Sequence, residues 1–227
     1  MSTRFDLIVF DYDGVVADSE LLNNQVMAEL LTEAGLPTTL DEAIAGYMGR
    51  SWRDIEPELA ERIGRPCPEL QELWTERCAL RAAAELQAVA GLHAFLDERP
   101  EQRCVASSSP PPWIELGLAR FGLAPDALGP IFSGAVHVAR GKPHPDLFLH
   151  AADALGVRPE RAVIIEDSPA GVRGGVAAGM TVIGLCAGGH IRDGHADALR
   201  RAGAHQVVGD YASVSRLLDA DPTPPPA

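Results

Sequence analysis

Short apolar runs alternate with amphipathic stretches over most of this chain, and the alternation predicts its fold. The runs with the length and composition of buried strands lie at 7–10, 104–106, 162–165, 181–185 and 206–208, with a weaker one at 130–133. Between them, apolar residues recur at helical spacing over 113–121, 146–155 and 170–178, and a glycine ends each of the last two segments. Strands and helices in alternation predict an α/β fold with an open, doubly wound parallel sheet of the Rossmann-like kind.

One long segment breaks this rhythm. From about residue 20 to 86 there is no convincing strand, and apolar residues recur only at helical spacing. They form two stripes: Leu21, Leu22, Val26, Leu30 and Leu31, and then Leu70, Leu73, Trp74 and Leu80. We expect residues 18–87 to form a helical cap domain inserted into an α/β core domain of residues 1–17 and 88–221. The joints are expected near 16–19 and 87–91.

Composition narrows the class of protein further. The chain has 227 residues, 46% hydrophobic and 22% charged, which is ordinary for a soluble globular protein. The apolar runs are short and broken by charges, so no segment is expected to span a membrane. Arg4 and Asp6, before a short apolar run, argue against a signal peptide. The four cysteines form no CxxC pair, which favours reduced thiols, a cytoplasmic location and no zinc site. The proline-rich end, 222–227, is predicted to be disordered.

The charge balance excludes one class of partner and raises a question about another. A formal net charge of −13 argues against nucleic acid, because phosphate backbones attract basic surfaces. An enzyme that acts on anionic substrates would have to gather positive charge locally against that background. Of the 19 basic residues only Lys142 is a lysine, and the rest are arginines.

Polar side chains follow the predicted strands where ligands bind in open α/β sheets, outside the carboxyl ends of the strands. The segments found there are Asp11-Tyr12-Asp13-Gly14, Ser107-Ser108-Ser109 and Glu166-Asp167-Ser168, and Gly141-Lys142-Pro143 comes before a predicted helix. Together they supply a nucleophile, hydroxyl donors, a cation and a pair of oxygen ligands. This set of groups is suited to phosphoryl transfer.

Asp11 and Asp13 are the first candidates for catalysis. Residues two apart in an extended segment point the same way, so both carboxylates can face one cavity. Asp11 can attack phosphorus and become an aspartyl-phosphate, while Asp13 protonates the leaving alcohol and later activates water. Gly14 would let the backbone approach the substrate. The alternative is a DxD sequence in a surface turn, but such a turn would not need the apolar strand that precedes it.

Glu166 and Asp167 are the candidates for a metal site. Adjacent carboxylates repel each other unless a cation lies between them, and Mg²⁺ prefers oxygen ligands. Asp11 and Asp167 would bind Mg²⁺ directly, Asp13 through its carbonyl oxygen, and Glu166 directly or through water. The alternative reading is that Asp167 or Ser168 caps the helix that begins near Pro169.

Lys142 and the serines complete the predicted site. Pro143 favours an extended conformation at Lys142, from which the ammonium could reach Asp11 and the phosphoryl oxygens. Ser107 would donate its hydroxyl to phosphate, with Ser108 and Ser109 adding donors at a helix start. The alternatives are an exposed lysine and an ordinary serine-rich loop.

In order and form, these segments resemble the motifs of the haloacid dehalogenase superfamily, in its subgroup with a helical cap after the first strand. The four segments that carry the resemblance are 10–20, 105–109, 141–146 and 165–171. The resemblance implies a magnesium-dependent phosphohydrolase of the phosphotransferase type, with Asp11 as nucleophile and Asp13 as acid and base. It implies a small phosphorylated metabolite, such as a sugar phosphate, as substrate, and says nothing about oligomeric state.

The cap departs from one branch of this family, the β-phosphoglucomutases. Asn23 stands where the mutases have a histidine, and Trp52 appears where they have an arginine, although Arg50 and Arg53 flank it. The stretch that resembles the family's specificity loop includes Gly49, Arg50, Ser51 and Trp52, which with Asn23 are the predicted substrate-binding residues of the cap. The alternatives are a core position for Trp52 and a solvated face for Arg50. We therefore expect a phosphatase, with a phosphosugar mutase or a non-catalytic phosphate sensor as alternatives.

Overall fold

A computed structural model of the chain describes residues 4–48 and 52–220 and contains one sheet of six parallel strands. The strands are β1 (Leu7–Phe10), β2 (Gln102–Ser107), β3 (Ile131–Ser133), β4 (Ala162–Glu166), β5 (Thr181–Leu185) and β6 (Gln206–Val208). Their order in the sheet is β3-β2-β1-β4-β5-β6. Because all pairs are parallel, every strand presents its carboxyl end at the same edge. The predicted α/β fold is confirmed.

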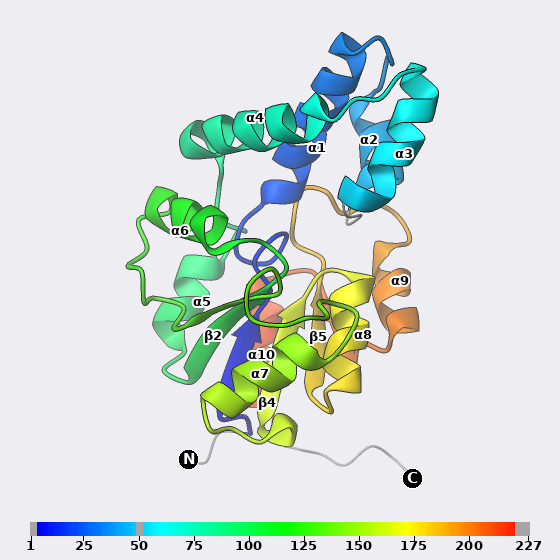
Figure 1. Cartoon of the computed structure of the whole chain (residues 1–227). Coiled ribbons are helices and arrows are strands. Elements are labelled where there is room, and N and C mark those ends of the chain that lie inside the picture. Colours follow the sequence, from blue (N-terminus) through cyan, green and yellow to red (C-terminus); the bar gives the residue numbers. More distant parts are fainter. Residues whose placement is uncertain (1–3, 49–51, 221–227) are drawn as a thin grey trace.

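Both faces of the sheet are covered, as the continuous apolar strands require. In β1, Ile8 and Phe10 join one hydrophobic cluster while Leu7 and Val9 join another. The first face packs against α5 (Leu92–Glu98), α6 (Pro111–Arg120) and α10 (Tyr211–Asp219), and the second against α7 (Asp146–Ala154), α8 (Pro169–Ala177) and α9 (His195–Ala202). In Figure 1, α7 and α8 lie in front of the sheet and α10 behind it. A short 3-10 turn, Pro159–Arg161, precedes β4.

Some helix bounds differ from the predicted ones for local reasons. Helix α6 begins at Pro111 and α8 at Pro169, since proline fits the first helical turn, where its missing N–H is not needed. Ser168 caps α8, and its hydroxyl accepts a hydrogen bond from the Gly171 amide at 3.0 Å. Sequence analysis did not predict α5, α9 or α10, which are short.

The inserted segment between β1 and α5 contains only helices within the described residues. They are α1 (Ser19–Glu33), α2 (Leu40–Tyr47), α3 (Trp52–Ile63) and α4 (Glu69–Glu85). Figure 1 shows them beyond the end of the sheet where the strands finish. Met27, Leu31 and Leu59 belong to a separate hydrophobic cluster of the insertion. Leu22 and Val26 of α1, by contrast, belong to the same cluster as the first face of the sheet.

The two chain segments that lead into and out of the insertion lie side by side. The Asp18 amide donates to the Gln87 carbonyl at 2.9 Å, and the Val89 amide donates to the Val16 carbonyl at 2.9 Å. Both backbone connections of the insertion thus pass through one paired crossing. Within the described residues, no helix has the length and apolar character needed to span a bilayer. The predicted disordered tail, 222–227, lies outside the described residues.

Candidate active site

Three buried carboxylates meet where β1 and β4 end. Asp11 follows β1, Glu166 is the last residue of β4, and Asp167 comes next. Phe10 pairs with Ile165 in the parallel ladder, and the Asp11 amide continues it by donating to the Ile165 carbonyl at 3.0 Å. Each acid offers one oxygen within 4.8 Å of the others. The sheet register therefore brings together acids that are more than 150 residues apart in sequence.

The single lysine of the chain points into this cluster. The Lys142 ammonium lies 2.7 Å from Asp11 Oδ1 and 2.7 Å from Glu166 Oε1, and its side chain is 5% exposed. It comes from the loop before α7, where Pro145 precedes the first helical residue. Burial alone would lower the pKa of Lys142, but Asp11 and Glu166 outweigh it and raise the pKa above its usual range. The exposed-lysine alternative is excluded.

One ammonium does not balance three buried carboxylates. Burial raises the pKa of Asp11 and of Asp167, the charge of Glu166 raises both further, and Lys142 only partly opposes this. A divalent cation among these oxygens would restore the ionised forms. Hard, buried carboxylate oxygens are the ligands that such a cation prefers, so the residues present fit a divalent metal.

The two oxygens of Glu166 have different partners. Oε1 accepts from Lys142, while Oε2 accepts from the Ser168 amide at 2.8 Å and from its hydroxyl at 2.9 Å. A Cβ placed on Gly171 would lie 1.5 Å from Oε1, so α8 must have a glycine where it passes this carboxylate. The same Ser168 that caps the helix thus orients Glu166, and capping and site construction coexist here.

Three side chains donate hydrogen bonds to the Asp13 carboxylate. The Ser19 hydroxyl donates to Oδ1 at 2.6 Å, the Trp113 indole donates to Oδ1 at 2.9 Å, and the Ser109 hydroxyl donates to Oδ2. These donors come from the start of α1, from α6 and from the loop after β2. Sequence reasoning missed Ser19 and Trp113 as partners, and the 100 residues between Trp113 and Asp13 leave no local signal for that contact. The Asp13 carbonyl oxygen as a metal ligand stays a prediction.

Gly14 is required by its neighbours. Its φ of +77° lies in the left-handed region, and a Cβ there would sit 1.7 Å from Asp167 Oδ2. Any side chain at this position would push Asp167 out of the cluster. This packing reason stands beside the predicted close approach to substrate.

The three serines after β2 are placed differently from one another. Ser107 is buried and its hydroxyl accepts from the Ser109 amide at 3.0 Å, while Ser108 is exposed. Ser109 is the residue bound to Asp13. Their predicted contacts with a phosphate stay predictions.

Comparison with known proteins agrees with this geometry. The family model described as haloacid dehalogenase-like hydrolase matches residues 5–179. The chain belongs to this family. It is 27% identical over 190 residues to 6-phosphogluconate phosphatase of Escherichia coli (strain K12), covering 83% of this chain and 86% of that protein.

Two solved structures show the same haloacid dehalogenase-like fold. The chain resembles a conserved haloacid dehalogenase-like protein of unknown function from Agrobacterium tumefaciens str. C58 with a TM-score of 0.85 and 35% identity, covering 94% of this chain and 97% of that one. It also resembles a haloacid dehalogenase family hydrolase from Deinococcus radiodurans R1, solved with bound phosphate and sodium, with a TM-score of 0.80 and 34% identity over 96% of each chain.

A further loop of this haloacid dehalogenase-like hydrolase reaches the site, and sequence reasoning did not include it. It follows β5 and carries His190, and α9 begins after it with His195. His190 Nε2 lies 3.0 Å from Asp167 Oδ2, and His195 Nε2 lies 2.6 Å from the Asp167 carbonyl oxygen. Neither histidine lies in a motif that could have been recognised in the sequence. Their contacts with Asp167 arise because β5 lies beside β4.

The cap residues of the predicted site lie among other cap side chains. Trp52 stacks on Trp74 with ring centroids 6.2 Å apart, and the Trp74 indole donates to the Asn23 carbonyl at 3.1 Å. Trp52 also packs against the hydrophobic cluster of the insertion, in agreement with the core alternative. Substrate contact by Asn23 and Trp52 stays a prediction. Gly49, Arg50 and Ser51 lie outside the described residues.

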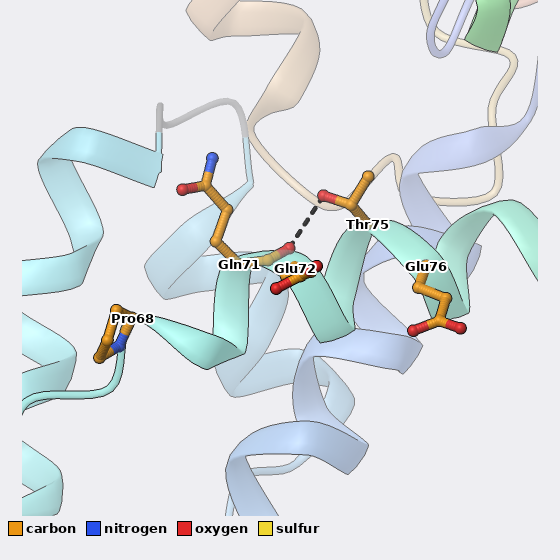
Figure 2. Close-up of a pocket in the computed structure, with 5 residues that line it drawn as sticks. All are labelled: Pro68, Gln71, Glu72, Thr75 and Glu76. Atoms are coloured by element: carbon orange, nitrogen blue, oxygen red, sulfur yellow. Dashed lines mark hydrogen bonds between the residues drawn. The ribbon is translucent and has the colours of Figure 1, made fainter.

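The protein also has an open groove along the first half of α4, away from the acid cluster and its lysine. Figure 2 shows its lining residues, Pro68, Gln71, Glu72, Thr75 and Glu76, with Thr75 hydrogen-bonded to the Gln71 carbonyl oxygen. The groove contains none of the strand-end groups, and its two glutamates would repel an anionic ligand. The acid cluster at the end of the sheet is the better candidate for chemistry.

Proposed function

We propose that the protein is a magnesium-dependent phosphatase that hydrolyses a small phosphomonoester, such as a sugar phosphate, through a phosphorylated Asp11. The observation that carries the proposal is the placement of Asp11 between Lys142 and Asp167 in one buried cluster. Similarity to a named 6-phosphogluconate phosphatase and to a hydrolase solved with bound phosphate supports the class of substrate.

Asp11 is the proposed nucleophile. Its carboxylate would attack phosphorus in line, with Lys142 balancing charge on the phosphoryl oxygens. Because Glu166 holds Lys142 from the other side, the ammonium has little freedom to leave Asp11. Asp11 and Asp167, the Asp13 carbonyl, and Glu166 directly or through water would hold Mg²⁺, which when bound neutralises phosphoryl charge.

Asp13 is the proposed acid and base. It would protonate the leaving alcohol and then take a proton from the water that hydrolyses the phosphorylated Asp11. The donors from Ser19, Ser109 and Trp113 would keep its carboxylate in place between the two half-reactions. Gly14 and Ser107, with the donors of Ser108 and Ser109, are proposed to bind the phosphate itself.

Residues 18–87 are proposed to act as a cap that selects the organic part of the substrate and excludes water. The paired crossing formed by residues 16–18 and 87–89 supports this, because both chain connections to the helices lie together at one point. Asn23 and the segment 49–52 are the proposed specificity residues. The cytoplasmic location predicted from the cysteines is retained in this proposal.

A panel of phosphorylated metabolites, assayed for phosphate release with and without Mg²⁺, tests the proposal. We expect metal-dependent release from at least one sugar or sugar-acid phosphate. Asp11→Asn should abolish both turnover and phosphoenzyme formation, a loss of about a thousandfold or more. Substantial activity in Asp11→Asn would contradict the mechanism. Absence of release from the whole panel with Mg²⁺ present would favour the phosphate-sensor alternative.

The same panel separates the phosphatase from the mutase alternative. A mutase would convert β-glucose 1-phosphate to glucose 6-phosphate without net phosphate release. We expect the reverse, which is release of phosphate with no isomeric sugar phosphate formed.

A further inference from the structure

His190 is buried against the acid cluster, although it lies outside the four motif segments. Its side chain is 1% exposed, and Nε2 lies 3.0 Å from Asp167 Oδ2. It comes from the Gly188-Gly189-His190 turn after β5, where the Ile191 amide donates to the Gly188 carbonyl at 3.2 Å. An imidazole in this position needs a reason, because burying a polar ring away from water is costly.

The packing around the ring fixes it in one place. A Cβ on Gly188 would lie 2.7 Å from His190 Cε1 and Nδ1, and a Cβ on Gly14 would lie 2.9 Å from Cε1. The ring therefore sits between two glycines, one from its own turn and one from the loop that carries Asp11 and Asp13. The turn is tied down as well, since the Gly189 amide donates to Asp18 Oδ1 at 2.8 Å.

Only one of the two ring nitrogens of His190 has a polar partner in this arrangement. Among the described residues Nδ1 has no hydrogen-bond partner, although it is buried. Nε2 lies 3.0 Å from the Asp167 carboxylate, and an ionised carboxylate accepts only, so the tautomer that suits this contact has its proton on Nε2. The position of the ring thus provides the contact with Asp167 but leaves Nδ1 without a hydrogen bond.

Asp167 is also contacted by the first residue of α9. His195 Nε2 lies 2.6 Å from the Asp167 carbonyl oxygen, and the two imidazoles are 5.6 Å apart at 78°. The close approach of His190 Nε2 to one carboxylate oxygen, at 3.0 Å, limits rotation of the carboxylate. That rotation decides where the second oxygen lies relative to Asp11 and Glu166.

We infer that His190 is a positioning residue that holds the Asp167 carboxylate in the orientation needed to bind the divalent cation. The inference rests on the metal site of the proposed function. Groups that orient a metal ligand from behind commonly change metal affinity by about 10–100-fold when they are removed. His190 would touch neither substrate nor metal, and its effect would pass through Asp167.

Two nearly isosteric substitutions separate this role from mere packing. His190→Gln can keep a side-chain N–H directed at Asp167, whereas His190→Met fills similar space without a donor. Binding of Mn²⁺ alone is measured by electron paramagnetic resonance on the full chain, and Mg²⁺ by competition. We expect His190→Met to weaken Mn²⁺ binding at least fivefold relative to His190→Gln, and Asp167→Asn to remove it.

Stability and kinetics supply the readouts that a packing role would not move. We expect the two His190 variants to have the same melting temperature in EDTA. The Mg²⁺ concentration for half-maximal activity should rise in His190→Met, while kcat at saturating Mg²⁺ stays near that of His190→Gln. A difference in Mn²⁺ affinity below fivefold would overturn the inference, as would absence of Mn²⁺ binding by the unaltered protein. If His190→Met does not fold, His190→Asn, whose shorter amide falls short of Asp167, takes its place under the same criterion.

The outcomes also separate this inference from the proposed function. Unchanged Mn²⁺ affinity together with Mg²⁺-dependent phosphate release would overturn only the role of His190. Weakened Mn²⁺ binding in His190→Met without phosphate release from any substrate would overturn only the proposed phosphatase activity.

Discussion

The charged groups at the end of the sheet and those on the inserted helices follow opposite rules. At the end of the sheet, Lys142, Asp11 and Glu166 are buried, and the ammonium lies 2.7 Å from a carboxylate oxygen of each acid. On the insertion, Arg77 and Glu33 also meet at 2.7 Å, but their side chains are 37% and 57% exposed. Exposed pairs contribute about 0–1 kcal/mol, whereas breaking a buried pair leaves an uncompensated charge. Similar distances therefore predict very different consequences of substitution.

The largest expected effect of this difference is on Lys142. Replacing it by methionine leaves Asp11 and Glu166 without their cation, and we expect kcat/KM to fall about 100-fold or more. Arg77→Ala is the matched control from the insertion, and it should change kcat/KM less than about twofold. Steady-state kinetics of both variants at saturating Mg²⁺ make the comparison. Similar losses in the two variants would break the contrast between buried and exposed ion pairs.

A second contrast concerns two tryptophans that each donate one hydrogen bond. Trp113 donates to the Asp13 carboxylate, and Trp74 donates to the Asn23 carbonyl in the insertion. Trp113→Phe removes a charge-assisted bond worth about 1.5–3 kcal/mol, so kcat should fall about tenfold. Trp74→Phe should leave the kcat for p-nitrophenyl phosphate unchanged. An unaffected kcat in Trp113→Phe would show that Asp13 needs no support from α6.

The proposed cap should act on binding of the organic group of the substrate rather than on the chemical step. We expect Asn23→Ala and Trp52→Ala to raise KM for the preferred metabolite about fivefold, the scale of a lost neutral hydrogen bond. The kcat for p-nitrophenyl phosphate, which lacks a sugar group, should change little. Equal loss of kcat on both substrates would instead place these residues in the cap core alone.

The smallest expected effect is on stability, at the junction of the two regions. Burial, with the charges of Asp13 and Asp167, raises the pKa of Glu20 from 4.5 to about 8. Between these values the folded chain keeps a proton that the unfolded chain releases, so the contribution of Glu20 to stability falls as pH rises from 4.5 to 8.

Glu20→Gln removes that dependence while keeping the shape of the side chain. In EDTA we expect its melting temperature to exceed that of the unaltered protein by roughly 3–5 °C at pH 8.5, about one to two kcal/mol, which is less than the full shift because Glu20 is only half-buried. The two proteins should melt together at pH 5. A variant that is less stable at pH 8.5 would contradict the burial of this carboxyl.

Much of the fold was determined by the sequence alone. The apolar runs predicted all six strands, because a parallel strand covered on both faces must be apolar along its length. The helices described in the insertion were expected from apolar stripes at helical spacing, and the division into core and cap domains stays a prediction. Short helices such as α9 were not predicted, because a few buried positions, in that helix Leu199, leave too weak a pattern.

The acid cluster and its lysine were predictable for a related reason. In a parallel sheet all strands end at the same edge, so acids placed directly after strands must converge, and Lys142 reaches them from the loop before α7. The partners of Asp13 and Asp167 were decided only by the tertiary structure. Trp113 and His190 reach their acids from neighbouring elements, and such contacts depend on which strands are adjacent and how far a side chain extends. Neither quantity is encoded in local spacing, because strand order is set by packing of the whole chain.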